Sequence, residues 1–208
     1  MNKIRIPDKN IKIKDKIISI FLIFLLGVIL GIFSKWLDNL SINDSIWWQH
    51  ILGVLDLRNV FSMFGIWIFI AITISVFSKT PYIASINVLA FFIGMTASYH
   101  LYTIFFSGFN LMKYMMIWYG ITLISPILAY ICWYAKSSSK ISIIISSFIL
   151  CVMFISSFNI GMWYFDLKSV IDLLIFIGTV FALYVKPKNT IYSLIISIVL
   201  AFLISFIL

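Results

Sequence analysis

The chain has no glutamate, and its 208 residues include only two cysteines and two histidines. Without glutamate there is no His-Glu-x-x-His zinc motif and no membrane protease built on paired glutamates. Two histidines cannot supply a three-histidine metal site, and no Asp or His cluster has ligand spacing. The two cysteines, Cys132 and Cys151, lie inside apolar blocks and are expected to be buried hydrophobes rather than a disulfide. We therefore predict no metal, no cofactor and no catalytic residue, and enzyme activity is the least supported class.

Charge is also scarce, at 11% of the residues, whereas 63% are hydrophobic and the mean hydropathy is +1.13. A soluble domain is about half apolar and a quarter charged, so this chain cannot cover itself with polar surface in water. Its apolar residues come in blocks of roughly 17–25, the length that crosses about 30 Å of hydrocarbon as a helix. The predicted fold class is therefore all-α, a polytopic bundle of transmembrane helices.

The apolar blocks predict seven spans in a single transmembrane domain, residues 17–208, preceded by a basic arm, residues 1–16. The predicted spans are residues 17–33, 60–78, 82–106, 115–135, 141–158, 169–185 and 190–207. The longest connector contains a short predicted helix near 45–55, whose tryptophans suit the membrane interface. This helix either anchors the outer end of the bundle or acts as a lid over an outward-facing cavity.

The basic residues predict the orientation of these spans. With the N-terminus inside, only four of the fifteen Lys and Arg residues fall on the outer side, namely Lys35, Arg58, Lys113 and Lys168. The remaining eleven fall on the cytoplasmic side: Lys3, Arg5, Lys9, Lys12, Lys14, Lys16, Lys79, Lys136, Lys140, Lys186 and Lys188. We therefore predict a multi-pass protein of the cell (plasma) membrane, with its N-terminus in the cytoplasm according to the positive-inside rule. An odd number of spans then places the C-terminus outside. The net charge of +8 is explained by this orientation and by anionic lipid headgroups rather than by nucleic acid.

Apart from Asp8 and Asp15 in the arm, the acidic residues fall on or near the outer face. They are Asp38, Asp44, Asp56, Asp166 and Asp172. Asp56 and Arg58 open the second span, where they are candidates for an ion pair or for a helix cap that includes Asn59. The arginine, with its planar and permanently charged group, also suits an anionic ligand.

Tyr99, His100 and Tyr102 form the most informative polar cluster inside a predicted span. His100 lies about two turns from the outer end, and an ionisable group at that depth should face protein or a water-filled cavity. Asp172 is the acid at comparable depth, so a contact between His100 and Asp172 is predicted, either as a functional pair or as a structural hydrogen bond between helices. The tentative ligand-binding residues are Asp56, Arg58, Tyr99, His100, Tyr102 and Asp172.

Small and polar residues inside the spans also predict how helices pack. Gly27 and Gly31 form a small-xxx-small motif that allows close approach of a second helix to the first span. Asn87 is expected to form a hydrogen bond to a neighbouring helix.

Three segments, Leu55–Ser62, Ser98–Thr103 and Ser125–Ala135, together resemble a group of small bacterial multi-pass membrane proteins of unknown function. The abundance of Ile, Lys, Asn and Ser resembles chains from AT-rich Gram-positive bacteria. The resemblance covers mainly residues 20–135 and implies a class of protein without implying an activity.

Three functions are compatible with these features. The first is a transport component that binds a small solute at an outward-facing polar site. Such a site resembles that of the small substrate-binding subunits of energy-coupling vitamin transporters, although their six spans, with both termini inside, differ from the seven predicted here. The second is a non-catalytic partner that regulates, stabilises or gives immunity to another complex, and the third is an intramembrane enzyme using His100 and Asp172. The expected partners are the lipid bilayer and other membrane subunits or a second copy of the chain.

Overall fold

The structure is a computed structural model, and it describes residues 5–8, 11–41, 43, 45–108, 112–161 and 163–207. Lys3, Lys9 and Asp44, which entered the predicted charge distribution, lie outside the described residues. The helices and strands, in order, are α1 (Ile13–Asn39), α2 (Trp47–Val54), α3 (Leu57–Ser62), α4 (Phe64–Phe77), α5 (Pro81–Ser107), α6 (Met112–Trp133), the 3-10 helix η1 (Tyr134–Lys136), α7 (Lys140–Ser157), β1 (Phe158–Ile160), β2 (Phe165–Leu167), α8 (Val170–Leu183) and α9 (Pro187–Ile207).

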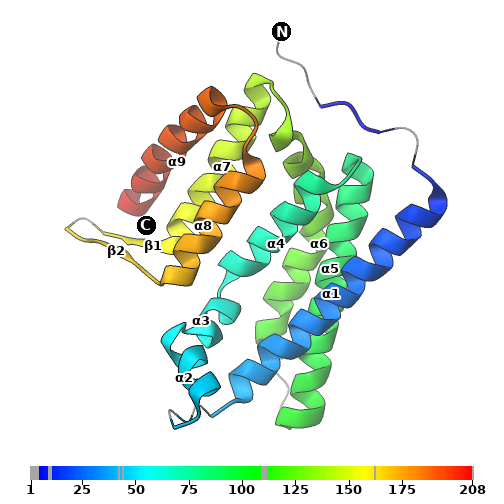
Figure 1. The fold of residues 1–208 in the computed structure, drawn as a ribbon, viewed down its shortest axis with the longest axis vertical. Coiled ribbons are helices and arrows are strands. Elements are labelled where there is room, and N and C mark those ends of the chain that lie inside the picture. Colours follow the sequence, from blue (N-terminus) through cyan, green and yellow to red (C-terminus); the bar gives the residue numbers. More distant parts are fainter. Residues whose placement is uncertain are drawn as a thin grey trace.

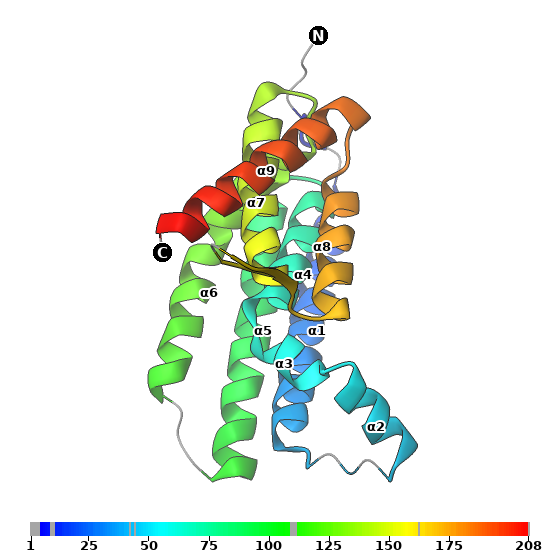
Figure 2. The same ribbon diagram turned by 90° about the vertical axis from the view of Figure 1, so that its left-hand side faces the viewer.

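Successive long helices run in opposite directions between two ends of the bundle (Figure 1). We call the end beside residues 5–8 the arm end, and the end that carries α2, α3 and the last turn of α1 the opposite end. Helix α4 lies in the middle, with α1, α5 and α6 on one side and α7 and α8 on the other. Helix α9 packs obliquely on α7 at the edge of the bundle (Figure 2).

All seven predicted spans form helices, and the prediction of an all-α bundle is confirmed at that level. Within the described part of the chain, five helices are long and apolar enough to cross a membrane: α1, α5, α6 with η1, α7 and α9. Helices α4 and α8 are apolar but have only 14 residues each. The second predicted span is broken, because Met63 takes an extended conformation between α3 and α4. A short helix, α2, forms where one was predicted near 45–55.

One small sheet was not predicted. Residues 158–167, between the fifth and sixth predicted spans, form an antiparallel hairpin in which Phe158 pairs with Leu167 and Ile160 with Phe165. The ring of Phe158 also stacks on that of Phe165, at 5.0 Å between centroids. The hairpin therefore closes the connection between α7 and α8 without another helix.

Large apolar side chains cover the outside of the bundle, and small or hydroxyl side chains lie inside it. On α1, Phe21 and Ile29 are 59% and 61% exposed, whereas Gly27 and Gly31 are buried. Ser197, at 0% exposed, is likewise buried where α9 packs on α7. This distribution is the one expected when lipid is the solvent, because close helix packing then depends on small residues rather than on hiding apolar ones.

The closest helix contact joins α1 and α5, as the small-xxx-small motif predicted. A Cβ atom added at Gly27 would overlap the carbonyl oxygen of Phe91, and one at Gly31 would overlap the carbonyl oxygen of Met95. From the other side, a Cβ at Gly94 would lie 2.5 Å from the carbonyl oxygen of Phe24. The two backbones are therefore in direct contact, and this contact fixes the rotation of α1 about its axis.

Arg5 joins the arm to the ends of two helices. Its Nη1 donates hydrogen bonds to the carbonyl oxygens of Val76, at 2.8 Å, and Trp133, at 3.1 Å, and its Nη2 donates to that of Ser78, at 3.2 Å. The guanidinium also lies 4.2 Å from the ring centroid of Trp133. Helix C-termini have unpaired carbonyls and partial negative charge, so one arginine satisfies the ends of α4 and α6 together. Burial lowers the pKa of Arg5 from its usual value. From the sequence, Arg5 was predicted only to be one of the positive charges that keep the N-terminus in the cytoplasm.

Replacing Arg5 by alanine is expected to lower the stability of the protein in detergent by about 2 kcal/mol, because the carbonyls it binds lose a charged donor. Arg5→Lys keeps the charge but loses the planar fork, and is expected to recover only part of the loss. The midpoint of denaturation by sodium dodecyl sulfate, followed by tryptophan fluorescence, measures both variants. Lys12→Ala, at an exposed position of the same arm, is the control and should change nothing. Equal midpoints for all three variants would contradict this role of Arg5.

Candidate functional site

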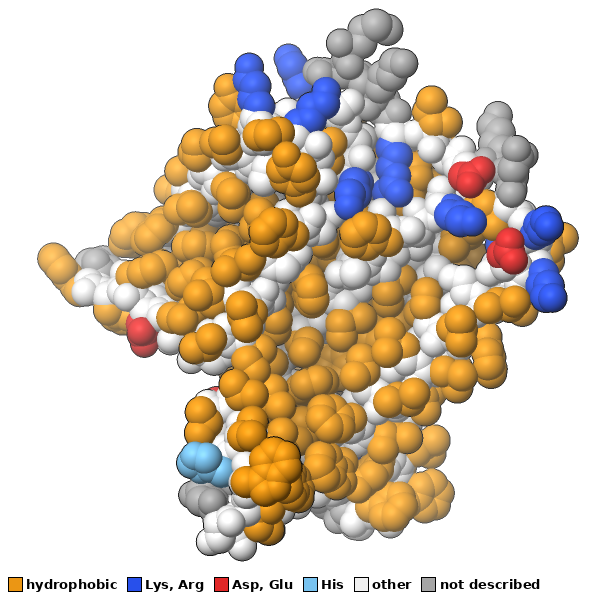
Figure 3. Space-filling model, in the orientation of Figure 1, with side chains coloured by type: hydrophobic (Ala, Val, Ile, Leu, Met, Phe, Trp, Pro, Cys, Tyr) orange, Lys and Arg blue, Asp and Glu red, His pale blue; other side chains and the backbone are white. Residues whose placement is uncertain are grey.

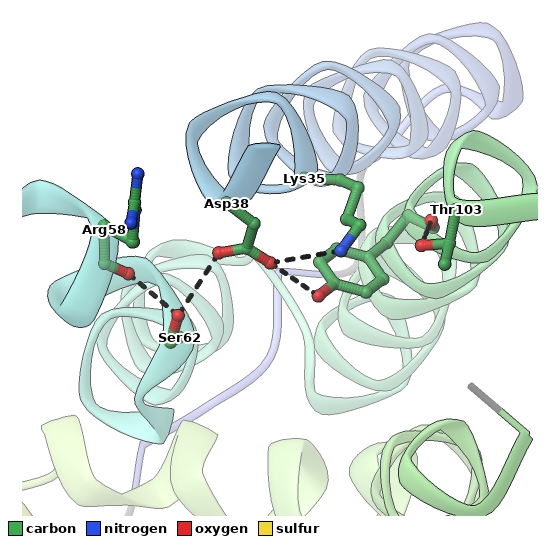
Figure 4. A network of polar contacts seen from close by, with 6 residues as sticks. Lys35, Asp38, Arg58, Ser62 and Thr103 are labelled. Atoms are coloured by element: carbon green, nitrogen blue, oxygen red, sulfur yellow. Dashed lines mark hydrogen bonds and ion pairs between the residues drawn. The ribbon is translucent and has the colours of Figure 1, made fainter. Parts of the chain in front are cut away.

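Asp38, in the last turn of α1, is the centre of a polar network at the opposite end of the bundle (Figure 4). Tyr99 of α5 donates a hydrogen bond from its hydroxyl to Asp38 Oδ2, at 2.7 Å. Ser62 of α3 donates to Asp38 Oδ1 at 3.4 Å, and Lys35 Nζ lies 3.7 Å from Asp38 Oδ2. We call Lys35, Asp38, Ser62 and Tyr99 the Asp38 network. It joins three helices through a single carboxylate.

The lysine of this network is buried. Only 6% of its side chain is exposed, compared with 21% for Asp38, and its Nζ also lies 5.3 Å from the ring centroid of Tyr99. Removing a charge from water is expensive unless a partner compensates it. The carboxylate of Asp38 and the face of Tyr99 are therefore what allow an ammonium group at this position.

Asp56 and Arg58 do not form the predicted ion pair with each other. Arg58 Nη2 donates a hydrogen bond to the carbonyl oxygen of Leu40, just beyond α1, so the arginine holds the connector against α3. Asp56 takes a left-handed conformation, with φ of 50°, and its Oδ2 accepts a hydrogen bond from Asn59 at 2.8 Å. Both residues thus serve the turn between α2 and α3.

His100 and Tyr102 face away from the Asp38 network, although they are sequence neighbours of Tyr99. His100 Nδ1 forms a hydrogen bond with the hydroxyl of Tyr119 on α6, and Tyr102 packs on Phe106, with 4.6 Å between ring centroids. Successive residues of a helix point about 100° apart, so Tyr99 reaches α1 while His100 reaches α6.

The predicted contact between His100 and Asp172 is not formed. Asp172 is 8% exposed and lies in the first turn of α8, which Ser169 caps: Ser169 Oγ accepts from the Asp172 backbone N–H at 3.0 Å and donates to Asp172 Oδ2 at 2.9 Å. Helix α8 packs on α4 and α7, whereas His100 pairs with α6. The two residues belong to different halves of the bundle. Depth is what the sequence indicated, and it does not determine which helices are neighbours.

A double-mutant cycle separates these two pairings. His100→Phe combined with Tyr119→Phe is expected to show a coupling energy of about 0.6–1.7 kcal/mol, the range for hydrogen bonds between membrane helices. His100→Phe combined with Asp172→Asn should be additive to within about 0.5 kcal/mol, because distant sites do not couple. Unfolding midpoints of the single and double variants give both values. The reverse order of couplings would restore the pair predicted from the sequence.

The cavity at the Asp38 network is very small. Its volume is about 10 Å³, and it is lined by residues that include Ser34, Asp38, Tyr99 and Trp67. That is about the space for one water molecule. This cavity is therefore closed to anything larger than water.

A larger cleft of about 360 Å³, with a mostly apolar lining, lies between α1, α4 and α5 at the arm end. The charged and polar part of its lining includes Asp15, Lys16 and Ser19 of α1, Lys79 before α5, and Asn87 of α5. Asn87 is 2% exposed, and its Nδ2 donates to Ser19 Oγ at 3.1 Å, which confirms the predicted hydrogen bond to a neighbouring helix. Its Oδ1 is buried and has no hydrogen-bond partner within the described part of the chain. A buried acceptor of this kind costs about 1–3 kcal/mol when unpaired.

Comparison with known protein families, curated proteins and solved structures finds no match. The resemblance to small bacterial membrane proteins therefore stays a prediction, and a function has to be argued from the geometry of this chain.

The two residues that organise the polar sites were missed as site residues. Asp38 had been placed among the outer acids and Lys35 among the outer bases, but their i, i+3 spacing at the end of a span was the available signal. Of the six predicted ligand-binding residues, only Tyr99 belongs to the Asp38 network and lines the small cavity. The other five are engaged elsewhere, by Asn59, Leu40, Tyr119, Phe106 and Ser169.

Proposed function

We propose that this chain is a membrane transport component for a small polar solute, in a conformation that is closed at the outer end and open at the arm end. The proposal rests on a pair of cavities along one helix interface, that of α1 with α4 and α5, which we call the seam. The closed cavity of about 10 Å³ and the open cleft of about 360 Å³ are both lined by α1, α4 and α5. Alternating access requires such a pair around a central barrier.

The proposed topology has seven spans, with the arm end in the cytoplasm and the C-terminus outside. Lys and Arg side chains gather at the arm end, above a middle zone covered by hydrophobic side chains (Figure 3). This placement agrees with the positive-inside rule. Helices α4 and α8 span only about 21 Å each, so they would cross as short segments supported by α3 and by the hairpin. Helix α2 would then lie at the outer interface of the membrane.

The barrier between the cavities is the contact of α1 with α5. Ile23 is the last residue of α1 that lines the cleft, and Ser34 is the first that lines the closed cavity. These positions are about 16 Å apart along the helix, and Gly27 and Gly31 pack against the α5 backbone between them. A tilt of α1 about this contact would widen one end while narrowing the other.

The charges of the cleft indicate the kind of solute. Its lining includes Asp15 together with Lys16 and Lys79. A lining that carries both signs of charge suits a polar or zwitterionic molecule better than a simple ion. On the outer side, release or entry of the solute would require the Asp38 network to open.

A non-catalytic partner of another membrane complex is the second candidate. The closed outer end favours it, because a protein that only stabilises another needs no solute-sized cavity there. The two candidates make different predictions about accessibility. In a transport component one end of the seam should close when the other opens, whereas in a non-catalytic partner the two ends should be independent.

Accessibility of two serines on α1 tests the proposal. In a background with Cys132 and Cys151 replaced by alanine, Ser19→Cys in the cleft and Ser34→Cys in the closed cavity report the two ends separately. A membrane-impermeant maleimide should label Ser19→Cys from the cytoplasmic side and leave Ser34→Cys, at a position that is 2% exposed, unlabelled from outside. Asp38→Asn, which weakens the outer closure, should raise labelling at position 34 and lower it at position 19.

Labelling at position 34 that rises while position 19 is unchanged would indicate local loosening and favour the partner hypothesis. Asp166→Asn, at an exposed acid of the hairpin, is the control for a change of one charge. It should alter neither site.

A further inference from the structure

An apolar groove of about 390 Å³ lies between α6 and α7, with α4 as its floor. The two helices meet at the arm end, where η1 and three serines connect them, and diverge from there (Figures 1 and 2). Side chains on both rims are partly exposed, including Leu128 and Ile131 on α6 and Ile144 and Phe148 on α7. The groove is therefore open sideways, toward the hydrocarbon of the bilayer.

The groove offers hydrocarbon and no free polar group. Its two hydroxyl side chains are satisfied within the protein, since Ser75 Oγ donates to the Ala129 carbonyl at 3.3 Å and Ser125 Oγ to the Thr122 carbonyl at 2.9 Å. Among the described residues two buried polar side-chain atoms have no hydrogen-bond partner, Arg58 Nε and Asn87 Oδ1, and neither residue lines the groove. An occupant that depends on hydrogen bonds to the groove is thus disfavoured.

The groove has about the length of one leaflet's hydrocarbon. Residues 121–132 of α6 line it over about 16 Å of helix axis. The hydrocarbon core of a bilayer is about 30 Å thick, so one leaflet contributes about half of that. An acyl chain that enters from one leaflet therefore matches the groove in length.

Two lysines stand where the groove reaches the arm end. Lys140 is the exposed first residue of α7, one turn before Ile144, and Lys136 ends η1, about one turn beyond Ile131 and Cys132. Lys136 Nζ lies 4.1 Å from the ring centroid of Phe77 at the end of α4, a residue that lines the cleft, so this ammonium group lies at the arm end between the groove and the cleft. The single ion pair among the described residues, Lys35–Asp38, is elsewhere. A positive charge above an apolar channel is complementary to an anionic lipid.

We propose that the α6–α7 groove binds one acyl chain of an anionic phospholipid from the cytoplasmic leaflet, with the lipid phosphate beside Lys136 and Lys140. The acyl chain would lie outside the cavities that carry the proposed transport function, whereas Lys136 also contacts Phe77 of the cleft. This arrangement makes occupancy of the groove depend on headgroup charge as well as on hydrocarbon.

Native mass spectrometry of the purified full-length chain in a mild detergent tests the site by titration with phosphatidylglycerol and phosphatidylcholine. The wild type is expected to retain one phosphatidylglycerol more tightly than phosphatidylcholine. Lys136→Gln with Lys140→Gln should weaken phosphatidylglycerol binding about 25-fold, or about fivefold for each lysine, and leave phosphatidylcholine unchanged. Lys186→Gln with Lys188→Gln, in the exposed turn before and at the start of α9, removes the same charge away from the groove and should have no effect.

A second pair of variants tests the groove itself. Ile131→Trp fills it and should abolish retention of the lipid, whereas Ile127→Trp, on the lipid-facing surface of the same helix, should not. Circular dichroism and the denaturation midpoint establish that both variants fold, and if Ile131→Trp fails this check, Leu128→Trp, which also fills the groove, replaces it. Equal loss in the two lysine pairs, or retention in a folded groove-filling variant, would overturn the proposal. So would a wild-type dimer that Ile131→Trp converts to a monomer, since a second copy would then be the occupant.

Discussion

Asp38→Ala is expected to destabilise the protein by about 3–5 kcal/mol, the loss typical of removing one partner from a buried ion pair. The substitution removes the acceptor for Tyr99 and Ser62 and takes the carboxylate away from Lys35, whose side chain is 6% exposed. Thermal denaturation in detergent, with tryptophan fluorescence as the signal, measures the loss.

Lys35→Met combined with Asp38→Asn should recover most of this stability, because no buried ammonium is then left without its acid. Asp166→Ala, at the exposed hairpin acid, should stay within about 0.5 kcal/mol of the wild type. A loss below 1 kcal/mol for Asp38→Ala would mean that the Asp38 network is solvated and that it does not close the outer end.

Gly27→Ala is the second large effect, and it is expected to cost about 1–3 kcal/mol. The added methyl group meets the backbone of Phe91 and Met95, which cannot rotate away as a side chain can. The two helices would have to separate along their whole contact, so Gly27→Leu should prevent folding.

Gly120→Ala on α6 is the matched control, because a Cβ at that position meets nothing within 4 Å. Alanine favours a helix over glycine by up to about 1 kcal/mol, so this variant should be stabilised. Midpoints of denaturation by sodium dodecyl sulfate give the sign of each change. A neutral Gly27→Ala would show that α1 does not approach α5 as closely as the structure has it.

The sequence predicted the helices of this fold better than their rotation. Blocks of apolar residues located every long helix, because the length and composition of a span are set by the thickness of the bilayer. The rotation of a helix depends on which small residues meet a neighbour, and both lipid and protein accept apolar side chains. Gly27 and Gly31 indicated which face of α1 meets a neighbouring helix. Asn87 did the same for α5, where it contacts Ser19 of α1.

The candidate site was predicted less well for the same reason. His100 and Asp172 were paired by depth alone, yet His100 faces Tyr119 on α6 and Asp172 bonds to Ser169, the N-cap of α8. Arg5 looked like one more positive charge of the arm, and only the fold brings the carbonyls of Val76 and Trp133 within its reach. Asp38 was recognised as an outer acid, but its contact with Tyr99 depends on the α1–α5 crossing.

The most direct test of the proposed transport function is to cross-link the cleft shut and then measure the accessibility of position 34 at the other end. Asp15 of α1 and Lys79, between α4 and α5, both line the cleft, and a short bifunctional thiol reagent joining Asp15→Cys to Lys79→Cys would hold these elements together. The reporter is Ser34→Cys, added to this pair and labelled with an impermeant maleimide from outside after the cross-link has formed. If the two ends open alternately, position 34 should be labelled in the cross-linked protein. It should stay unlabelled in the control, in which a monofunctional reagent modifies the two cleft cysteines without joining them. Position 34 remaining protected in both samples would contradict an alternating seam and leave the chain as a non-transporting partner.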